Sequence, residues 1–426
     1  MLRTRKRLAT TVSVLAAASL LITACGDDKK DATPTTTAAA PSSTAASTDS
    51  TTAGSGSTAE STAGSTVDSA ASAGPKATAK GCEGTGATDP NDTSVGRKPA
   101  RCEKGFPAPQ PLKEMTTINV SSAFKLEFNS PLLLADSMGE LAKENLKMNF
   151  INLKFADAVP QMAAGQIDVA VGGLEVALLA AGNQGLPVKA TLANYFPPHA
   201  GDYTVPQTGL WCRRDAFTTP DKPNLKEIEK MKLASSVGRG TVSWYYTVEE
   251  IRRQGVADFN MVNATIEAIP SADIPAALQN NAINCGIILD PMWLQFVDKP
   301  EYFLAASQTP GEPLGIYAFG KRLLVDNPEI GDAFARAFLR TVNTYFNGDY
   351  HKDPAVMAKI AEATGQNPEQ LSRVDSLVMD WEFRAKTTTE VQKLFIELGV
   401  ITDWKTPVPE DKIIDRSFAL RAVGAG

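Results

Sequence analysis

The stretches DAVPQMAAGQIDVAVGGLE (Asp157–Glu175) and DIPAALQNNAINCGIILDP (Asp273–Pro291) share one hydrophobic pattern, although few of their residues are identical. Each predicts a helix, a tight turn and a buried strand. The stretches lie 116 residues apart, and the same offset pairs Met115 with Met231 at the heads of two strand-like runs. A repeated α/β unit indicates two lobes, and two lobes with a cleft between them are typical of a protein that closes on a small molecule.

The first 24 residues have the pattern of an export signal. Basic residues near the start precede an apolar run that ends at Ile22 and is too short to span a bilayer comfortably. The sequence LITAC (Leu21–Cys25) resembles a bacterial lipoprotein signal, in which the cysteine is lipidated and becomes the first residue. We therefore expect Cys25 to anchor the protein to the outer face of the cytoplasmic membrane. The alternative is an ordinary secretory signal in which Cys25 has no such role.

The rest of the chain divides by composition. From Asp31 to about Lys80 the chain is nearly all Thr, Ser, Ala and Gly, with almost nothing large and apolar to bury, and residues 25–80 are therefore predicted to be a disordered linker. A tether of this length reaches on the order of 40 Å. We expect a disulfide-stapled extension at 81–114, lobe 1 at 115–208, lobe 2 at 209–308, and a return to lobe 1 with C-terminal helices at 309–426.

Charge and composition exclude several classes of protein. The formal charge is −6 and becomes −10 without the four basic residues of the signal. An acidic chain lacks the excess of Lys and Arg that phosphate neutralisation requires, so nucleic acid is not an expected partner. The two histidines, His199 and His351, have no neighbours at metal-ligand spacing, and no G-x-S-x-G, Walker or H-E-x-x-H motif occurs. We expect a binding protein without metal or cofactor, not an enzyme.

Four cysteines remain once Cys25 is assigned to the lipid. In an oxidising compartment their even number predicts two disulfides. Cys82 and Cys102 bracket a stretch rich in Gly, Pro and Asp, and a bridge between them would staple the extension. Cys212 and Cys285 lie in strand-like segments of lobe 2 and are expected to meet across neighbouring strands. The alternative for Cys285 is a free thiol in the core.

Strand and helix patterns alternate in both lobes, which favours mostly parallel sheets covered on both faces. In lobe 1 the patterns predict strands at 116–122, 148–153, 166–173 and 186–195, and helices at 130–146, 157–165 and 174–185. In lobe 2 they predict strands at 232–238, 259–263 and 283–289, and helices at 241–255, 274–282 and 291–298. We expect chain crossings near 206–210 and 307–313, and a helical segment from 322 to 398 whose aromatic residues, such as Phe334, Phe338 and Tyr345, pack in the core.

Candidate ligand contacts lie in the turns that follow the predicted strands, because ligands gather at the carboxyl ends of strands in open α/β sheets. In lobe 1 these turns contain Phe124, Glu127, Phe128, Asn129, Gly173 and Glu175. In lobe 2 they contain Arg239, Gly240, Thr241, Trp244, Asp290 and Trp293. The two sets of turns are expected to face each other across the cleft.

The clearest of these turns is residues 236–243, SVGRGTVS, where a strand runs through two glycines into a helix. Free N–H groups at a helix start bind anions, and glycine lets a ligand approach the backbone. The alternatives are a plain tight turn with Thr241 as the N-cap, and a solvated Arg239. Carboxylates of other turns oppose the helix start, so a ligand that meets both carries an amine. The aromatic residues either stack on the ligand or belong to the core.

Three stretches together resemble a known family: QMAAGQIDVAVGGLEVALLAAGNQGLPVKA (161–190), LKEIEKMKLASSVGRGTVSWYYTVEEIRRQG (225–255) and IPAALQNNAINCGIILDPMW (274–293). They are similar to the nitrate, sulfonate and taurine class of ABC-importer substrate-binding proteins, which also includes binders of thiamine-pyrimidine precursors. The resemblance covers residues 116–346. It implies an α/β, bilobal type II periplasmic-binding-protein-like fold, no catalytic activity, and delivery of ligand to a membrane permease driven by an ATPase.

The resemblance also assigns roles to residues. It implies that Gly238–Thr241 hold an anionic or polar ligand group and that residues 290–293 form the cleft edge. Lys125, Glu127 and Phe128 depart from the family pattern in a turn that usually meets the ligand. This departure argues against nitrate or a simple alkylsulfonate.

We therefore expect a monomeric, lipid-anchored solute receptor of an ABC importer. Its ligand would be a small polar organic nutrient, such as a sulfonate or taurine-like zwitterion or an amine-bearing heterocycle. One alternative is a surface sensor or interaction protein on the same fold. The other is an enzyme of pyrimidine synthesis with this fold, which would require a cytosolic chain with a clustered His or Cys site.

Overall fold

The computed structural model describes residues 82, 99–196, 208–308, 315–383 and 386–425, all within one compact unit, Ser69–Gly426. The predicted signal, Cys25, the linker and His199 lie outside the described residues, as do most residues of the two predicted crossings. Within the described residues, no helix is both long and apolar enough to cross a membrane.

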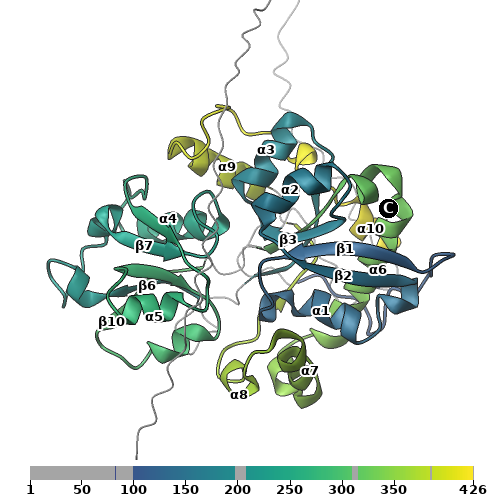
Figure 1. Ribbon diagram of the computed structural model, residues 1–426, viewed down its shortest axis with the longest axis horizontal. Helices are drawn as coiled ribbons and strands as arrows, with labels where there is room; N and C mark the ends of the chain where they lie inside the picture. The colour runs from purple at the N-terminus through teal and green to yellow at the C-terminus, as the bar shows by residue number, and fades with distance from the viewer. Residues whose placement is uncertain (1–81, 83–98, 197–207, 309–314, 384–385, 426) are drawn as a thin grey trace, which may run out of the picture. The chain divides into compact units, whose positions relative to one another are not determined.

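The sheet of lobe 1 has five strands in the order β2-β1-β3-β11-β4. These are β1 (Thr116–Ser122), β2 (Leu146–Asn152), β3 (Val169–Gly173), β4 (Lys189–Ala193) and β11 (Gly315–Phe319). β1 is parallel to β2 and β3, whereas β11 is antiparallel to β3 and β4. Helices α2 (Phe155–Ala163) and α3 (Val176–Gln184) lie on one side of this sheet and α1 (Ser130–Ser137) on the other (Figure 1).

The sheet of lobe 2 has the order β10-β6-β9-β7-β8. Its strands are β6 (Gly209–Arg213), β7 (Lys232–Ser235), β8 (Thr265–Ala268), β9 (Cys285–Ile288) and β10 (Tyr302–Ser307). β7 is parallel to β8 and β9, and β6 is antiparallel to β9 and β10. Helices α4 (Val242–Arg253) and α5 (Ile274–Gln279) cover opposite faces (Figure 1).

The two sheets confirm the duplicated unit that the sequence predicts. Each has four mutually parallel strands and one antiparallel strand in the same relative position. β1 and β7 start 116 residues apart, as do β3 and β9. After each crossing the chain enters the new sheet with its antiparallel strand, which is β11 in lobe 1 and β6 in lobe 2. Each sheet thus contains one strand that lies outside the repeated unit.

The C-terminal segment consists mainly of helices: η6 (Arg322–Asp326), α6 (Pro328–Tyr345), α7 (Pro354–Thr364), α8 (Pro368–Leu371), α9 (Thr387–Glu397) and α10 (Ser417–Ala422). A short pair, β5 (Tyr195–Phe196) with β12 (Val378–Met379), joins it to lobe 1. Helix α9 contacts α4 of lobe 2, where Arg252 Nη2 lies 2.8 Å from Glu397 Oε1. The short 3₁₀ helices are η1 (Glu127–Asn129), η2 (Ala142–Glu144), η3 (Arg214–Ala216), η4 (Leu225–Lys230), η5 (Met292–Gln295), η7 (Tyr350–Lys352) and η8 (Glu410–Lys412).

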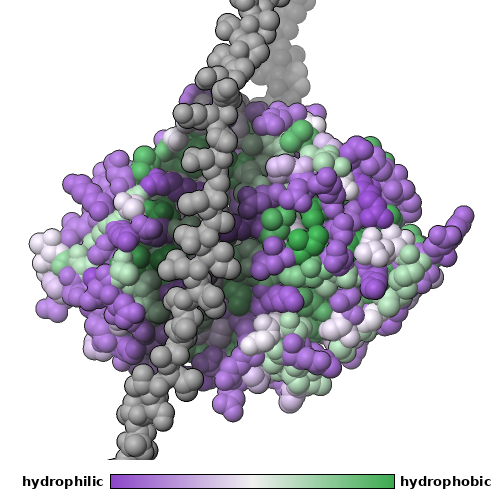
Figure 2. All heavy atoms as spheres, in the orientation of Figure 1, coloured by the Kyte–Doolittle hydropathy of each residue, from purple (hydrophilic) through white to green (hydrophobic). Residues whose placement is uncertain are grey.

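The core of lobe 1 follows the two-residue period of its strands. Tyr317 and Phe319 of β11 point to one face, where Phe338 and Phe334 of α6 pack against them with ring centroids 4.5 and 5.6 Å apart. Ile316 and Ala318 belong to the cluster on the other face. Phe334 and Phe338 of α6 are therefore core residues, as predicted, whereas Tyr345 is half-buried at the edge of this cluster. On the face that Figure 2 shows, hydrophilic residues predominate and hydrophobic ones form smaller patches.

Both predicted disulfides are present. Cys82 bonds to Cys102, and the Cys102 N–H donates to Asn343 Oδ1 of α6 at 2.9 Å, so this bridge lies against lobe 1. Cys212 and Cys285 are directly opposite in the β6–β9 pair and are bonded to each other. The alternative of a free Cys285 thiol is wrong.

Four predictions differ from the structure. The segment predicted to be helical from 322 to 398 contains strand β12, and the helix predicted at 291–298 is the short 3₁₀ helix η5. The helix predicted at 130–146 ends at Ser137, because Gly139 (φ +74°) and Asn145 (φ +56°) turn the chain toward β2. The strand predicted at 259–263 is a loop, and β8 follows it. Phe259 and Met261 are nearly fully buried and thus explain the apolar pattern, but carbonyl groups of this loop accept hydrogen bonds from Arg239.

Candidate ligand-binding site

A cavity of about 110 Å³ is lined by residues of both lobes. This volume is several times the ~10–15 Å³ that one water molecule requires. From lobe 1 and the crossings it is lined by Ser122, Ala123, Phe124, Phe128, Lys154, Phe155, Ala156, Val171, Gly172, Gly173, Glu175, Tyr195, Gln308 and Gly315. From lobe 2 it is lined by Ser236, Val237, Val242, Ser243, Ile287 and Leu289. The site thus lies at strand ends in both lobes, with room for a small organic molecule.

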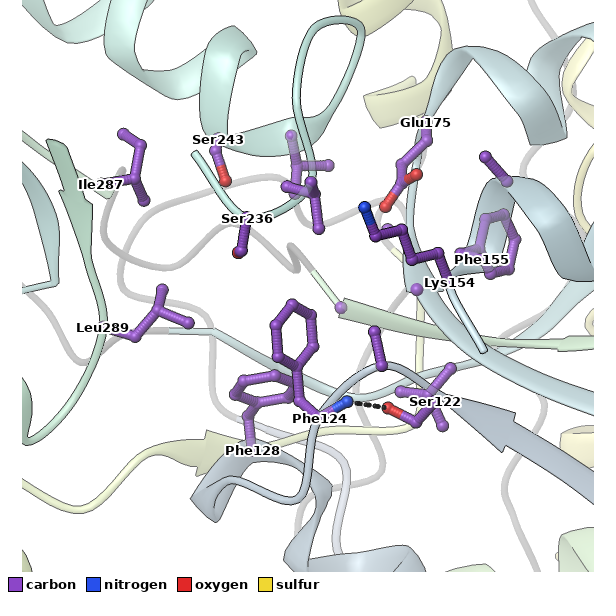
Figure 3. Close-up of a pocket in the computed structure, with 18 of the residues that line it drawn as sticks. Ser122, Phe124, Phe128, Lys154, Phe155, Glu175, Ser236, Ser243, Ile287 and Leu289 are labelled. Carbon is purple, nitrogen blue, oxygen red and sulfur yellow. Dashed lines mark hydrogen bonds between the residues drawn. The ribbon is translucent and has the colours of Figure 1, made fainter. Parts of the chain in front are cut away.

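One wall of the cavity is aromatic. The rings of Phe124 and Phe128 meet edge to face with centroids 5.8 Å apart, and Phe128 stacks on Tyr195 at 5.5 Å. Ile287 and Leu289 of lobe 2 lie on another side of the same space (Figure 3). Such surfaces favour a flat or alkyl ligand part, because its burial removes apolar area from water.

Asn129 shapes the turn that carries this wall. Its side-chain N–H₂ donates to Ser122 Oγ at 2.8 Å and to the Phe124 carbonyl at 2.6 Å. The Phe124 N–H donates to the same Ser122 hydroxyl at 3.2 Å. Asn129 is fully buried, so it positions the aromatic residues and does not itself line the cavity.

Glu175 places a carboxyl group in the cavity from the N-cap position of α3. The residue is 9% exposed. Burial raises the pKa of Glu175 to about 8, against a smaller lowering by a hydrogen bond with the Gly173 backbone. The exposed Lys154, after β2, extends toward this carboxyl (Figure 3). Among the described residues neither side chain is in an ion pair within 4.0 Å. With a pKa of about 8, Glu175 is mostly protonated at pH 7 in the empty cavity, and a bound cation favours its ionised form.

The start of α4 presents the opposite electrostatic character from lobe 2. Val242 and Ser243, in the first turn of this twelve-residue helix, line the cavity together with Ser236. The first N–H groups of a helix carry partial positive charge, and two hydroxyls lie beside them. Thr241 is the N-cap residue, but its hydroxyl donates to the Gly238 carbonyl at 3.1 Å. The cavity therefore has an acid on lobe 1 and a helix start on lobe 2.

Arg239 and Trp244, two predicted contacts, support loop 259–264 instead. The Arg239 guanidinium donates to the Val262 carbonyl at 2.9 Å and also bonds the carbonyls of Met261 and Ala264. It lies 5.1 Å from the ring of Trp244, which is 4% exposed. Neither side chain lines the cavity.

The glycine turn and the first turn of lobe 1 make further contacts outside the cavity. The Gly240 carbonyl accepts a hydrogen bond from the Val176 N–H of lobe 1 at 3.0 Å. Lys125, which departs from the family pattern, is exposed and lies 4.8 Å from the ring of Phe150.

Glu127, Asp290 and Trp293 lie beside the cavity. Glu127 Oε1 accepts from Tyr350 Oη and pairs with His351 Nε2, both at 2.5 Å. Trp293 is a core residue whose indole N–H donates to Asp290 Oδ1. Burial raises the pKa of Asp290 to about 6, and the charge of Glu127 adds to this. Burial lowers the pKa of His351, but its hydrogen bond and charge interaction with Glu127 outweigh burial, so the pKa is raised overall.

The structure thus separates the predicted contacts into three groups. The main cavity is lined by Phe124, Phe128, Gly173 and Glu175, and a smaller chamber by Glu127, Phe128 and Asp290. The side chains of Asn129, Arg239, Thr241, Trp244 and Trp293, and the backbone of Gly240, support them from outside.

Sequence reasoning left out four polar lining residues: Ser122, Lys154, Tyr195 and Gln308. Ser122 ends β1 and Lys154 follows β2, so their positions at strand ends were a usable signal, whereas Ser236 and Ser243 lie in the predicted turn 236–243. Tyr195 and Gln308 lie beside the crossings, where no periodic pattern marks a contact.

No protein-family model and no curated protein matches this chain. Solved structures do match. The nitrate-binding protein NrtA from Synechocystis PCC 6803 is 14% identical with a TM-score of 0.56, over 74% of this chain and 90% of that one. The ligand-binding component of an ABC-type import system from Staphylococcus aureus is 15% identical with a TM-score of 0.53, over 72% and 99%.

The alkanesulfonate-binding protein SsuA from Xanthomonas axonopodis pv. citri is 13% identical with a TM-score of 0.52, over 71% of this chain and all of that one. These likenesses confirm the predicted bilobal type II periplasmic-binding-protein fold. At such low identity they are likenesses of fold.

Proposed function

We propose that this chain is the solute-binding protein of an ABC importer. The observation that carries the proposal is the cavity of about 110 Å³ walled by strand ends of both lobes, in a fold shared with binding components of such importers. A ligand that contacts both lobes stabilises the closed arrangement by its differential affinity for it. The protein binds and does not transform its ligand.

The ligand we propose is a small organic molecule with an apolar body and an amine, such as a taurine-like zwitterion or an amine-bearing heterocycle. The carboxyl group of Glu175 can bind the amine. The start of α4, with Ser236 and Ser243, can bind an anionic or polar group at the other end of the ligand. The aromatic wall of the cavity can pack against the apolar body of the ligand, between these two groups. A nitrate ion would leave this wall without a partner.

We further propose that the protein is lipid-anchored through Cys25 on the outer face of the cytoplasmic membrane, as a monomer that docks on a permease. The LITAC sequence and the Ser/Thr/Ala-rich linker support the anchor. Metabolic labelling with a fatty acid tests it, and Cys25→Ala is expected to abolish the label. A label that persists in this variant would contradict the anchor.

Binding is tested by thermal shift and titration calorimetry on the purified protein. The panel contains taurine, alkanesulfonates, aminopyrimidines and simple amines, and we expect at least one solute to raise Tm by several degrees with a one-to-one stoichiometry. Native mass spectrometry of the untreated protein adds any co-purified molecule to the panel. If no small solute binds at millimolar concentration and nothing co-purifies, the proposed function is wrong.

A further inference from the structure

A small polar chamber of about 10 Å³ adjoins the main cavity. It is lined by Glu127, Phe128, Tyr195, Thr208, Leu289, Asp290, Gln308 and Leu377. Phe128, Tyr195, Leu289 and Gln308 also line the main cavity, so the two spaces share a wall. A volume of this size is about that of one water-sized occupant. The chamber receives one carboxyl group from lobe 1, Glu127, and one from lobe 2, Asp290.

Glu127 is 1% exposed, and its two oxygens differ. Oε1 accepts a hydrogen bond from Tyr350 Oη and pairs with His351 Nε2. Oε2 is buried and has no hydrogen-bond partner within the described residues. A buried carboxylate oxygen without a partner destabilises the fold, because no hydrogen bond offsets the loss of its contact with water. Such an orphan oxygen in a chamber wall indicates an occupant that supplies positive charge or a donor.

The charges around the chamber do not balance. The negative charge of Glu127 and the positive charge of a protonated His351 cancel. The charge of the Asp290 carboxylate, on the opposite side of the chamber, then remains. Asp349, near His351, is paired with Lys352 at 3.0 Å and so leaves this balance unchanged, and Tyr350 is neutral. The Thr208 hydroxyl is hydrogen-bonded to the Asp290 carboxyl, and Gln308 and Tyr195 contribute further side-chain oxygens to the wall. Oxygen-rich surroundings with one net negative charge suit a hard monovalent cation.

We propose that this chamber binds a monovalent cation between the two lobes. The cation is either free Na⁺ or K⁺ or the ammonium head of the transported ligand, and the second source rests on the proposed function. In both cases the occupant screens Glu127 from Asp290 and so favours the arrangement in which the lobes meet.

The experiment compares Tm of the full chain in sodium, potassium, methylammonium and tetramethylammonium chloride at equal ionic strength and pH 7.5. Tetramethylammonium is too large for the chamber and reports non-specific salt effects. We expect a cation that fits to raise Tm by about 2–4 °C over tetramethylammonium. The difference should shrink at pH 5, since the pKa of Asp290 is about 6 and its carboxyl is then protonated. It should also vanish in Asp290→Asn but persist in Asp298→Asn, an exposed control.

The outcomes separate the sources. Stabilisation by Na⁺ or K⁺ identifies a free ion, and stabilisation by methylammonium alone identifies the ligand's ammonium group. Equal Tm values in all four salts at pH 7.5, or a difference that persists in Asp290→Asn, overturn the proposal and leave the chamber to water. If Asp290→Asn does not fold, the pH series on the unaltered chain decides alone. A negative result here does not affect solute binding in the main cavity, which the calorimetric panel measures separately.

Discussion

The amide nitrogen of Val176, at the start of α3 in lobe 1, donates a hydrogen bond to the carbonyl oxygen of Gly240, on the turn before α4 in lobe 2, at 3.0 Å. This bond joins the two turns that contribute Glu175 and the α4 start to the cavity. The glycine turn predicted to hold a ligand group therefore also forms part of the contact between the lobes.

Gly240→Ala should weaken this contact more than Gly238→Ala. Both glycines have positive φ, +72° and +79°, so alanine at either site costs about 1–2 kcal/mol. A Cβ at Gly240 would lie 2.9 Å from Val176 Cγ2, whereas one at Gly238 has no atom within 4 Å. We expect Gly240→Ala to lose about 1–3 kcal/mol more in unfolding free energy and to bind solute more weakly. Equal losses in denaturant unfolding would show that the lobes do not meet here.

Glu175 should make the stability of the ligand-free protein depend on pH. Its pKa rises from 4.5 to about 8 on folding, so the folded state holds the proton more tightly. This contribution is fully present below pH 4.5 and is lost as pH rises to about 8, by up to ~1.4 kcal/mol per pH unit. The unfolding free energy of Glu175→Gln, measured with denaturant, should depend less on pH in this window than that of the unaltered chain. The exposed control Glu362→Gln should keep the pH dependence of the unaltered chain. Identical slopes in all three proteins would contradict the assignment.

His351 should stabilise the fold as a cation. Its folded pKa is above the ordinary 6.5, so its stabilisation is complete below pH 6.5 and is lost as pH rises through the folded value. His351→Ala leaves the Glu127 carboxylate buried without its charge partner and should cost about 3–5 kcal/mol at pH 6. His351→Gln supplies a donor without charge and should cost less. The difference in unfolding free energy between the unaltered chain and His351→Gln should be smaller at pH 8 than at pH 6. A difference that is larger at pH 8 would exclude a charged His351.

Arg239 should matter for stability and not for ligand affinity. Its guanidinium bonds carbonyl groups of loop 259–264, outside the cavity. Arg239→Ala should lower the unfolding free energy by about 1–3 kcal/mol, because these carbonyls lose a charged donor. The affinity for a bound solute should stay within about twofold, because the loss of Arg239 removes no contact with the ligand. A tenfold change would correspond to about 1.4 kcal/mol of binding free energy. Arg253→Ala, which removes another exposed arginine of lobe 2, is the control. A tenfold loss of affinity in Arg239→Ala but not in Arg253→Ala would show that Arg239 contacts the ligand.

The sequence predicted the elements whose periodicity is local. β1 at Thr116–Ser122 and α3 ending before Gly185 agree with prediction, because alternation and a glycine C-cap depend on neighbours in the chain. The loop at 259–263 was mistaken for a strand because packing buried its apolar residues without ladder hydrogen bonds. β10 and β11 flank a crossing, and no repeat pattern predicts them.

By itself, the sequence determined the duplicated α/β unit, the disulfide pairs and the strand ends at which the cavity lies, because hydrophobic period, cysteine number and turn residues are properties of local chain. Only the tertiary structure decided which side chains of those turns meet the cavity. Glu175 and Arg239 look alike as charged turn residues, yet one lines the cavity and the other bonds loop carbonyls. That choice depends on side-chain direction and on partners from distant segments, as for Glu127 and His351, which are 224 residues apart.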